Sequence, residues 1–146
     1  MVENIIEIQK LLFIPNLNVN ISGLELINDK YRVPVGIIQI PVENALLHGL
    51  RNKEIGECKL EIKILDFIDN YHICINDNGV GRNKATLINN FKKNGNGLKT
   101  IYEMIAIINS NKSNSIKFHI DDLQNDLGTK VTIQLNKNID YDKIKL

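Results

Sequence analysis

The sequence predicts an α+β fold: a two-layer sandwich with one mixed, mostly antiparallel sheet of about five strands and helices on one face. Two periodicities and their order along the chain predict it. Several short segments alternate apolar and polar residues, as strands with one buried face do, and others place apolar residues at helical spacing. Helices and strands do not alternate strictly, so a doubly wound parallel sheet is not expected.

Three elements are expected in the first part of the chain. The pattern predicts a helix over residues 2 to 13, closed by Pro15, because proline cannot continue a helix. A strand follows at Leu17, Val19 and Ile21. An amphipathic helix is then expected from Val35 to Gly49. Pro41 falls inside it, at a cost of roughly 3 kcal/mol unless the helix kinks or starts there, so we expect a local kink.

The remaining elements follow the same rules. A strand through Leu60, Ile62 and Ile64 and a central strand over residues 71 to 76 are joined by a hairpin turn at Asp69 and Asn70. Next come a helix whose apolar positions recur from Leu98 to Ile108 and two more alternating strands, at residues 116 to 120 and 131 to 135. The tail from Asn138 carries alternating charge and is expected to be either loose or a packing arm.

Composition narrows the class of protein. The 146 residues suffice for one ordinary domain, and 18 basic against 17 acidic residues give a net charge of +1, so nucleic acid is not expected as a partner. No apolar run approaches the roughly 18 residues of a membrane helix, and the acidic, periodic beginning is unlike a signal peptide. We therefore expect a cytoplasmic chain. Cys58 and Cys74 have no metal or redox spacing and are expected to be reduced thiols.

Two glycine clusters are candidate ligand sites. Asp77, Asn78, Gly79, Val80 and Gly81 directly follow the central strand, where a carboxylate can accept hydrogen bonds and glycines let a ligand approach the backbone. An ordinary turn is an equally good interpretation. Residues 94 to 98, with Gly95, Gly97 and Leu98, open a helix whose N–H groups could face a phosphate, although a plain loop with an N-cap is the commoner case.

Two further elements are weaker. Asn44 and His48 lie four residues apart and would share one face of an α-helix, where asparagine is unfavourable unless it meets water or a ligand. A surface histidine is the commoner interpretation of His48. Gly128 and Thr129 enter the last strand, and an ordinary turn is the default there.

The order of these four clusters resembles that of the histidine-kinase-like ATPases, whose fold is called the GHKL or Bergerat fold. Within that family the sequence is most similar to bacterial two-component sensor histidine kinases, whose pattern Gln-x-x-x-Glu-Asn-Ala-x-x-His-Gly occurs here at Gln39 to Gly49. The resemblance covers about residues 14 to 137 and includes all four clusters in order.

The resemblance implies a site for Mg-ATP. Asn44 would coordinate Mg²⁺, Asp77 would accept the adenine amino hydrogen, and Glu43 is a second catalytic candidate, a general base for water. The other implied ATP-binding residues are His48 along the nucleotide, Gly79 and Gly81 at the base and sugar, Gly95, Gly97 and Leu98 at the phosphates, and Thr129 at the adenine end. Residues 82 to 94 would form the lid, with Phe91 as anchor and Lys92 or Lys93 at the phosphates, unless they are a solvated basic loop.

Some positions depart from the family pattern. Leu47 stands where many relatives carry Lys or Arg, and Thr100 where an Asn often follows; both changes weaken phosphate contacts. The phosphoacceptor histidine is also missing, because His48 belongs to the implied nucleotide site while His72 and His119 fall on predicted strands.

The resemblance therefore implies the catalytic part of a sensor histidine kinase, which passes the γ-phosphoryl group of ATP to a histidine on an upstream dimerisation domain, with a response regulator as the next recipient. Residues 1 to 13 would lead from that domain, 14 to 137 would bind ATP, and 138 to 146 would be a tail. Contact of this domain with a membrane or with nucleic acid is not expected, whereas a full-length parent anchored in a membrane is compatible with the resemblance. The alternatives are a stand-alone GHKL ATPase, an anti-sigma-factor-like serine kinase, and a degenerate, non-catalytic nucleotide-sensing or dimerisation module.

Overall fold

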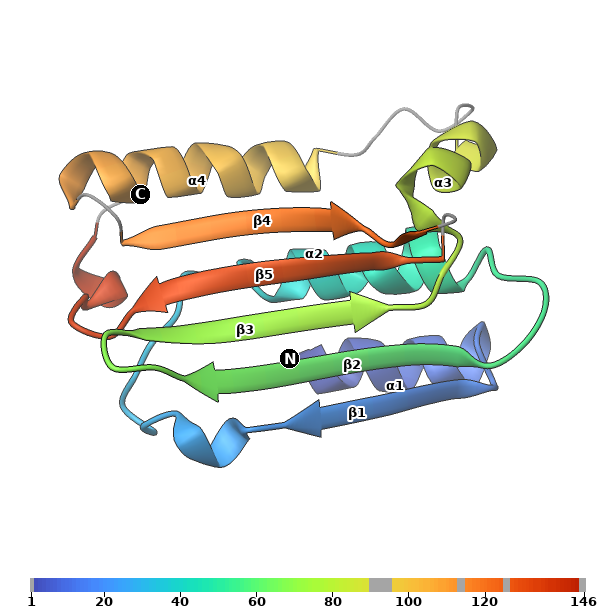
Figure 1. The fold of residues 1–146 in the computed structure, drawn as a ribbon, viewed down its shortest axis with the longest axis horizontal. Coiled ribbons are helices and arrows are strands. Elements are labelled where there is room, and N and C mark those ends of the chain that lie inside the picture. The colour runs from blue at the N-terminus through green and yellow to red at the C-terminus, as the bar shows by residue number, and fades with distance from the viewer. Residues whose placement is uncertain (1, 90–95, 113–114, 125–126, 145–146) are drawn as a thin grey trace.

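A computed structural model describes residues 2–89, 96–112, 115–124 and 127–144. These residues form one mixed sheet of five strands in the order β1-β2-β3-β5-β4 (Figure 1). β1 pairs in parallel with β2, and the other pairs are antiparallel. The strands are β1 (Leu17–Ser22), β2 (Cys58–Asp66), β3 (Asn70–Asp77), β4 (Ile116–Asp122) and β5 (Thr129–Asn136). The predicted fold class and all five strand segments are confirmed.

The helices form the second layer. In Figure 1, α1 (Val2–Leu12) and α2 (Gln39–Asn44) lie behind the strands, and α4 (Gly97–Asn111) runs beside β4 and packs into the same core. The helix α3 (Gly81–Asn89) lies beyond the end of β3, in contact with residues 45 to 50. Short helical turns occur at Leu24–Leu26 and Tyr141–Lys143, and a π-helix, η2, occupies Ala45–Leu50.

One continuous core lies between the helices and one face of the sheet. Strand residues such as Ile62, Ile73 and Ile133 meet the helical residues Leu46 and Ile101 there, all of them buried. Burying one such side chain contributes about 1.5 to 3 kcal/mol relative to leaving it exposed. Along each strand, every second side chain faces this core and the others lie on the opposite, more polar face of the sheet. This arrangement produces the alternating sequence that predicted the strands.

The helix expected from Val35 to Gly49 is shorter and changes type. Val35 is 82% exposed and precedes the helix, because Gly36 has a φ of 82°, outside the right-handed helical region. α2 begins only at Gln39, so Pro41 is its third residue and its missing N–H falls in the first turn, where amides lack intrahelical partners. The helix then widens at Ala45, where hydrogen bonds span five residues, as from the Arg51 N–H to the Leu46 carbonyl oxygen at 2.9 Å.

The tail is a packing arm as far as the described residues extend. Tyr141 is buried, and its hydroxyl donates to the carbonyl oxygen of Ser115 at 2.6 Å and accepts from the Asn136 N–H at 3.1 Å. At the other terminus, Ile6 of α1 belongs to the same core. Both ends of the described chain are therefore packed onto the sandwich.

Other expectations can be checked in brief. The β2–β3 hairpin is present, with the Phe67 N–H donating to the Asn70 carbonyl oxygen at 2.9 Å. Cys58 and Cys74 are both free thiols. Among the described residues, no helix combines the length and apolar character needed to span a bilayer.

Candidate functional site

Residues from three separate predicted clusters meet where β3 ends. Asp77 is the last residue of this central strand and pairs with Leu60 of β2. Thr129 begins the adjacent strand β5, and the loop from Asn78 to Val80 leads on to α3. The π-helix η2, with His48 and Gly49, packs against this loop.

Asp77 is a buried carboxylate held by two donors. Its side chain is only 4% exposed. The Gly79 N–H donates to Oδ1 at 2.8 Å, and the Thr129 hydroxyl donates to Oδ2. Burial raises the pKa of Asp77, while the hydrogen bonds from Thr129 and Gly79 and the positive charge of Lys53 oppose that rise. Because a carboxylate offers about four acceptor positions, both oxygens can accept further hydrogen bonds.

Gly49 and Gly79 allow η2 to lie directly on the strand-end loop. A Cβ atom at position 79 would overlap the backbone of Gly49, and one at position 49 would come within 2.8 Å of Asp77 Oδ1. The contact is closed by the Val80 N–H, which donates to the Gly49 carbonyl oxygen at 3.2 Å. The glycines of two distant motifs are thus needed for one backbone-to-backbone contact beside Asp77.

Gly128 closes the site from the other side. Its φ of 111° is a conformation that residues with side chains rarely adopt, and a Cβ there would overlap the carbonyl group of Asp77. Gly128 and Thr129 were predicted to enter the last strand, and Thr129 is the first residue of β5 with Gly128 directly before it. This placement brings the Thr129 hydroxyl to Asp77.

The candidate residues of the motif from Gln39 to Gly49 differ in how exposed they are and in their hydrogen bonds. Asn44 is half-buried, and its amide has no hydrogen-bond partner among the described residues. The Glu43 carboxylate accepts from the Gln39 amide at 2.7 Å, and His48 is exposed. The chain changes from α-helix to π-helix directly after Asn44, so the expectation that Asn44 and His48 share a face, which assumed α-helical spacing, remains a prediction.

The second glycine cluster is only partly described. Gly97 is the first residue of α4 and lies against α2, since a Cβ there would come within 2.8 Å of Ile40 Cγ2. Leu98 follows it in the first turn and packs against the core. The Thr100 hydroxyl donates to the Asn96 carbonyl oxygen at 3.0 Å. Gly95 and the predicted lid residues Phe91, Lys92 and Lys93 lie outside the described residues.

The first part of the predicted lid is a helix, α3, which begins at Gly81. Arg82 makes a two-pronged ion pair with Asp122 at the end of β4: Nε to Oδ1 and Nη2 to Oδ2, each 2.6 Å. The pairing lowers the pKa of Asp122 and raises that of Arg82. The two residues are 40 positions apart, and no local sequence pattern indicated the pair.

The sequence also gave no sign of a polar network beneath the strand-end loop. Lys53, in the loop after η2, donates through Nζ to the carbonyl oxygens of Glu57 and Asn78, each at 3.0 Å. Asn78, which was predicted only as a member of the cluster from Asp77 to Gly81, donates to the Glu57 carbonyl oxygen through its amide at 3.0 Å. A lysine in a charged surface loop has no distinguishing local signature.

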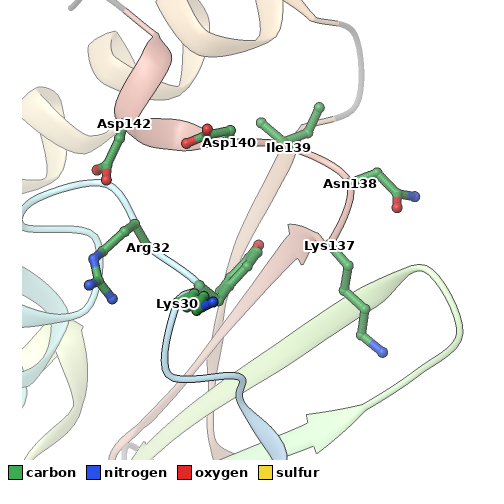
Figure 2. A pocket seen from close by; sticks show the side chains of 8 residues that line it. Lys30, Arg32, Lys137, Asn138, Ile139, Asp140 and Asp142 are labelled. Carbon is green, nitrogen blue, oxygen red and sulfur yellow. The ribbon is translucent and has the colours of Figure 1, made fainter.

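Two surface hollows lie at the opposite end of the sheet. The larger, of about 440 Å³, is lined by side chains such as Arg32, Lys137 and Asp140 (Figure 2). The smaller, of about 300 Å³, includes Asn70, at the start of β3. Along the eight residues of β3, Asn70 is about 23 Å from Asp77. Several of their charges are already paired, Lys137 with Asp66 and Asp140 with Lys143, so they are no alternative to the site at Asp77.

The described residues contain no group of three or more His, Cys, Asp or Glu side chains that could hold a metal ion. Mg²⁺, however, prefers oxygen ligands and keeps several waters, so one protein oxygen together with phosphate oxygens suffices. The half-buried amide of Asn44, which meets no partner in the described part of the chain, offers such an oxygen. Asn44 therefore fits a magnesium ion that arrives with a phosphorylated ligand.

Comparison with solved structures identifies the fold. The chain is similar to the Acinetobacter baumannii histidine kinase AdeS, with a TM-score of 0.56, 18% identity, and coverage of 94% of this chain and 62% of that one. It is also similar to the mycobacterial sensor histidine kinase MprB, with a TM-score of 0.51, 13% identity, and coverage of 92% and 91%. No family model and no curated protein matches the sequence. The chain has the fold of these kinase structures and spans less than two thirds of the AdeS chain.

Proposed function

We propose that this chain is the ATP-binding catalytic domain of a sensor histidine kinase. The observation that carries the proposal is the geometry at Asp77: a buried carboxylate at the end of the central strand, held by Thr129 and Gly79 and packed under the Gly49 backbone. These residues come from three motifs far apart in the sequence. The shared fold with two histidine kinase structures supports the same function.

Asp77 is the proposed determinant of adenine binding. An ionised carboxylate can only accept hydrogen bonds, so it favours the amino group of adenine and disfavours the carbonyl group that guanine carries at that position. Gly79 and Gly81 keep side chains away from the base and sugar. Thr129 fixes one carboxylate oxygen, which leaves Asp77 in a defined orientation.

The phosphate end is assigned to Asn44 and to the start of α4. The Asn44 amide oxygen would hold Mg²⁺, which neutralises charge on the phosphates when bound. The N–H groups at Gly97 and Leu98 begin α4, where the helix dipole favours an anion. Phosphoryl transfer depends mainly on positioning and charge neutralisation, so a domain that holds Mg-ATP can serve a histidine on another domain. That domain and then a response regulator are the proposed partners.

A stand-alone ATPase is the second candidate, and Glu43 is the residue that separates it from the first. An ATPase needs a base for the attacking water, and Glu43 would have to exchange its hydrogen bond with Gln39 for one with water. The degenerate, non-catalytic alternative rests on Leu47 and Thr100, which offer no charge to the phosphates.

The first experiment is titration of the chain with ADP and a non-hydrolysable ATP analogue, with and without Mg²⁺, by calorimetry. We expect the wild type to bind and Asp77→Asn to lose binding, because the new amide places an N–H donor against groups that also donate hydrogen bonds. Asp142→Asn removes the same charge at the other end of the sheet and is expected to have no effect. Asn44→Ala is expected to remove the Mg²⁺ dependence, and Asn4→Ala on α1 is its control. Unchanged binding in Asp77→Asn would disprove the assignment.

The second experiment identifies the acceptor. The parent protein, with every domain it carries, is incubated with γ-labelled ATP, and the label is tested for stability in acid. A histidine kinase gives an acid-labile phosphohistidine, a serine kinase gives an acid-stable label, and an ATPase releases free phosphate without labelling the protein.

A further inference from the structure

Lys53 occupies an unusual position for a lysine in a surface loop. Its side chain is half-buried and turns inward, so that Nζ donates to the Glu57 and Asn78 carbonyl oxygens at 3.0 Å each. Its own N–H donates to the Leu50 carbonyl oxygen at the end of η2, also at 3.0 Å. Lys53 thus links η2, its own loop and the backbone directly after Asp77.

Asn78 is held at all four of its polar groups. Its N–H donates to the Lys59 carbonyl oxygen at 3.2 Å, and its side-chain oxygen accepts from the Lys59 N–H at 2.7 Å. Its side-chain amide donates to the Glu57 carbonyl oxygen at 3.0 Å, and its own carbonyl oxygen accepts from Lys53. Because the peptide bond to Asn78 is planar, fixing Asn78 also restricts the backbone of Asp77.

The positive charge of Lys53 also acts on the Asp77 carboxylate. Burial raises the pKa of Asp77, and the hydrogen bonds from Thr129 and Gly79, followed by the charge of Lys53, oppose that rise. The titratable residues on the neighbouring strands and on η2 have these positions. Lys59, Glu61 and Lys130 alternate with inward-facing positions and lie on the open face of the sheet, and His48 is exposed on η2.

We propose that Lys53 is a positioning residue for Asp77: its ammonium group, bound to the Asn78 carbonyl oxygen, fixes the turn after β3 and adds a positive charge that favours the ionised carboxylate, the form that accepts the amino hydrogen of an adenine nucleotide. The inference rests on the proposed function for its ligand, but its effect on Asp77 exists without any nucleotide. Lys53 itself touches backbone oxygens and is not assigned a contact with the ligand.

The test that needs no nucleotide is a carbon NMR titration of the Asp77 carboxyl group, assigned by its loss in Asp77→Asn. Lys53→Gln removes the charge but keeps an N–H donor, and Lys53→Arg keeps the charge. Lys63→Gln removes a lysine charge from an exposed position on β2 and is the matched control. We expect a higher titration midpoint in Lys53→Gln and wild-type midpoints in the other two variants.

An unchanged midpoint in Lys53→Gln, with circular dichroism showing a folded chain, would overturn the inference, and so would an equal rise in Lys63→Gln. Should Lys53→Gln not fold, Lys53→Arg still decides: a midpoint far from the wild-type value would mean that the charge at this position does not govern Asp77. A purely structural role predicts weaker folding without a change in midpoint.

The second readout is ADP affinity across the pH range of the NMR titration. Lys53→Gln is expected to bind about tenfold more weakly than wild type below the Asp77 midpoint measured for the variant, as for the loss of one charge-assisted interaction, and the deficit should shrink above that midpoint. A deficit independent of pH would contradict the proposed role of the charge. If wild type binds no ADP while the NMR midpoint still moves, the proposed function fails and the effect of Lys53 on Asp77 stands.

Discussion

At the scale of single residues, Asp77 shows a conflict between stability and binding. Because burial raises its pKa, the folded chain holds this proton more tightly than the unfolded chain does. The free energy of unfolding therefore falls as the pH rises from the unfolded pKa of the group through its folded pKa. The hydrogen bonds from Gly79 and Thr129 limit this cost, and the ionised state that destabilises the fold is the one proposed to bind adenine.

Gly128 allows a prediction about how tightly this site is built. Gly128→Ala forces an alanine to a φ of 111° and also into the carbonyl group of Asp77. Gly56→Ala imposes comparable backbone strain at a φ of 88°, but a Cβ there meets only Lys53 Cε at 3.9 Å. We expect about 1 to 2 kcal/mol of destabilisation for Gly56→Ala and more than about 3 kcal/mol for Gly128→Ala, measured by urea unfolding. Equal losses would mean that the close approach to Asp77 is relaxed in solution.

At the scale of elements, local sequence patterns predicted the strands but not the features that depend on contacts between distant residues. The five strands were predictable because one face of each is buried, as at Leu60 and Ile62, and burial leaves an alternating sequence. The change to a π-helix at Ala45 was not predicted, and neither was the contact that this π-helix makes between Gly49 and Gly79, whose sequence positions are far apart. The motifs themselves indicated Asp77 and Thr129, but not the hydrogen bond between them.

The helix α3 and its anchor show the same limit. The segment GRNKATLIN has no clear apolar stripe, so helical periodicity could not predict it, and its neighbours 90 to 95 lie outside the described residues. Its link to the sheet, from Arg82 to Asp122, joins positions that only the folded chain brings together. Lys53 and Asn78 are a second example of such a link.

The Arg82 and Asp122 pair gives a prediction for α3. Both side chains are nearly half exposed, at 46% and 40%, so Asp122→Asn should reduce global stability by no more than about 1 kcal/mol. Its local effect should be larger, because the pair ties the start of α3 to β4. We expect faster amide hydrogen exchange in α3, measured by mass spectrometry, and no change in Asp121→Asn, whose side chain pairs with His119 instead.

The pH dependence of this pair has a defined sign. Because Arg82 lowers the folded pKa of Asp122, the stabilisation is complete above the unfolded pKa of the carboxyl group and is lost as the pH falls through the lowered folded value. Exchange in α3 of the wild type should therefore approach that of Asp122→Asn in strong acid. Protection of α3 that is the same in both proteins at neutral pH would show that the pair does not anchor the helix.

At the scale of the whole molecule, the two ends of the sheet differ in the residues that they carry. The end of β3 at Asp77 carries the candidate site, whereas the start of β3 carries a cluster of three tyrosines. There Tyr31 packs edge-on against Tyr71, with ring centres 5.0 Å apart, and against Tyr141 at 6.2 Å. The charged hollow of Figure 2 borders this cluster, because Tyr31 is part of its lining. This end of the sandwich is where the C-terminal segment joins the core.

Tyr141 therefore tests whether the tail belongs to the cooperative domain. Tyr141→Ala removes a buried ring and should cost about 3 to 5 kcal/mol, which is a large part of the stability of a domain of this size. Tyr141→Phe keeps the ring but loses the hydrogen bond to the Ser115 carbonyl oxygen, and should cost about 1 kcal/mol. Tyr102→Ala, which removes a ring that is 51% exposed on α4, is the control and should cost less than Tyr141→Ala.

The measurement is denaturant unfolding followed both by circular dichroism and by intrinsic tyrosine fluorescence. If the tail is part of one core, the two signals fall together and Tyr141→Ala shifts the single transition to lower denaturant. A tail that only rests on the surface would detach first, giving a separate early transition and a Tyr141→Ala variant with wild-type stability. Tyr141 is hydrogen-bonded to the residue before β4 and to the end of β5. If the tail is part of the core, removing it should therefore also destabilise β4 and β5, the strands that carry Asp122 and Thr129.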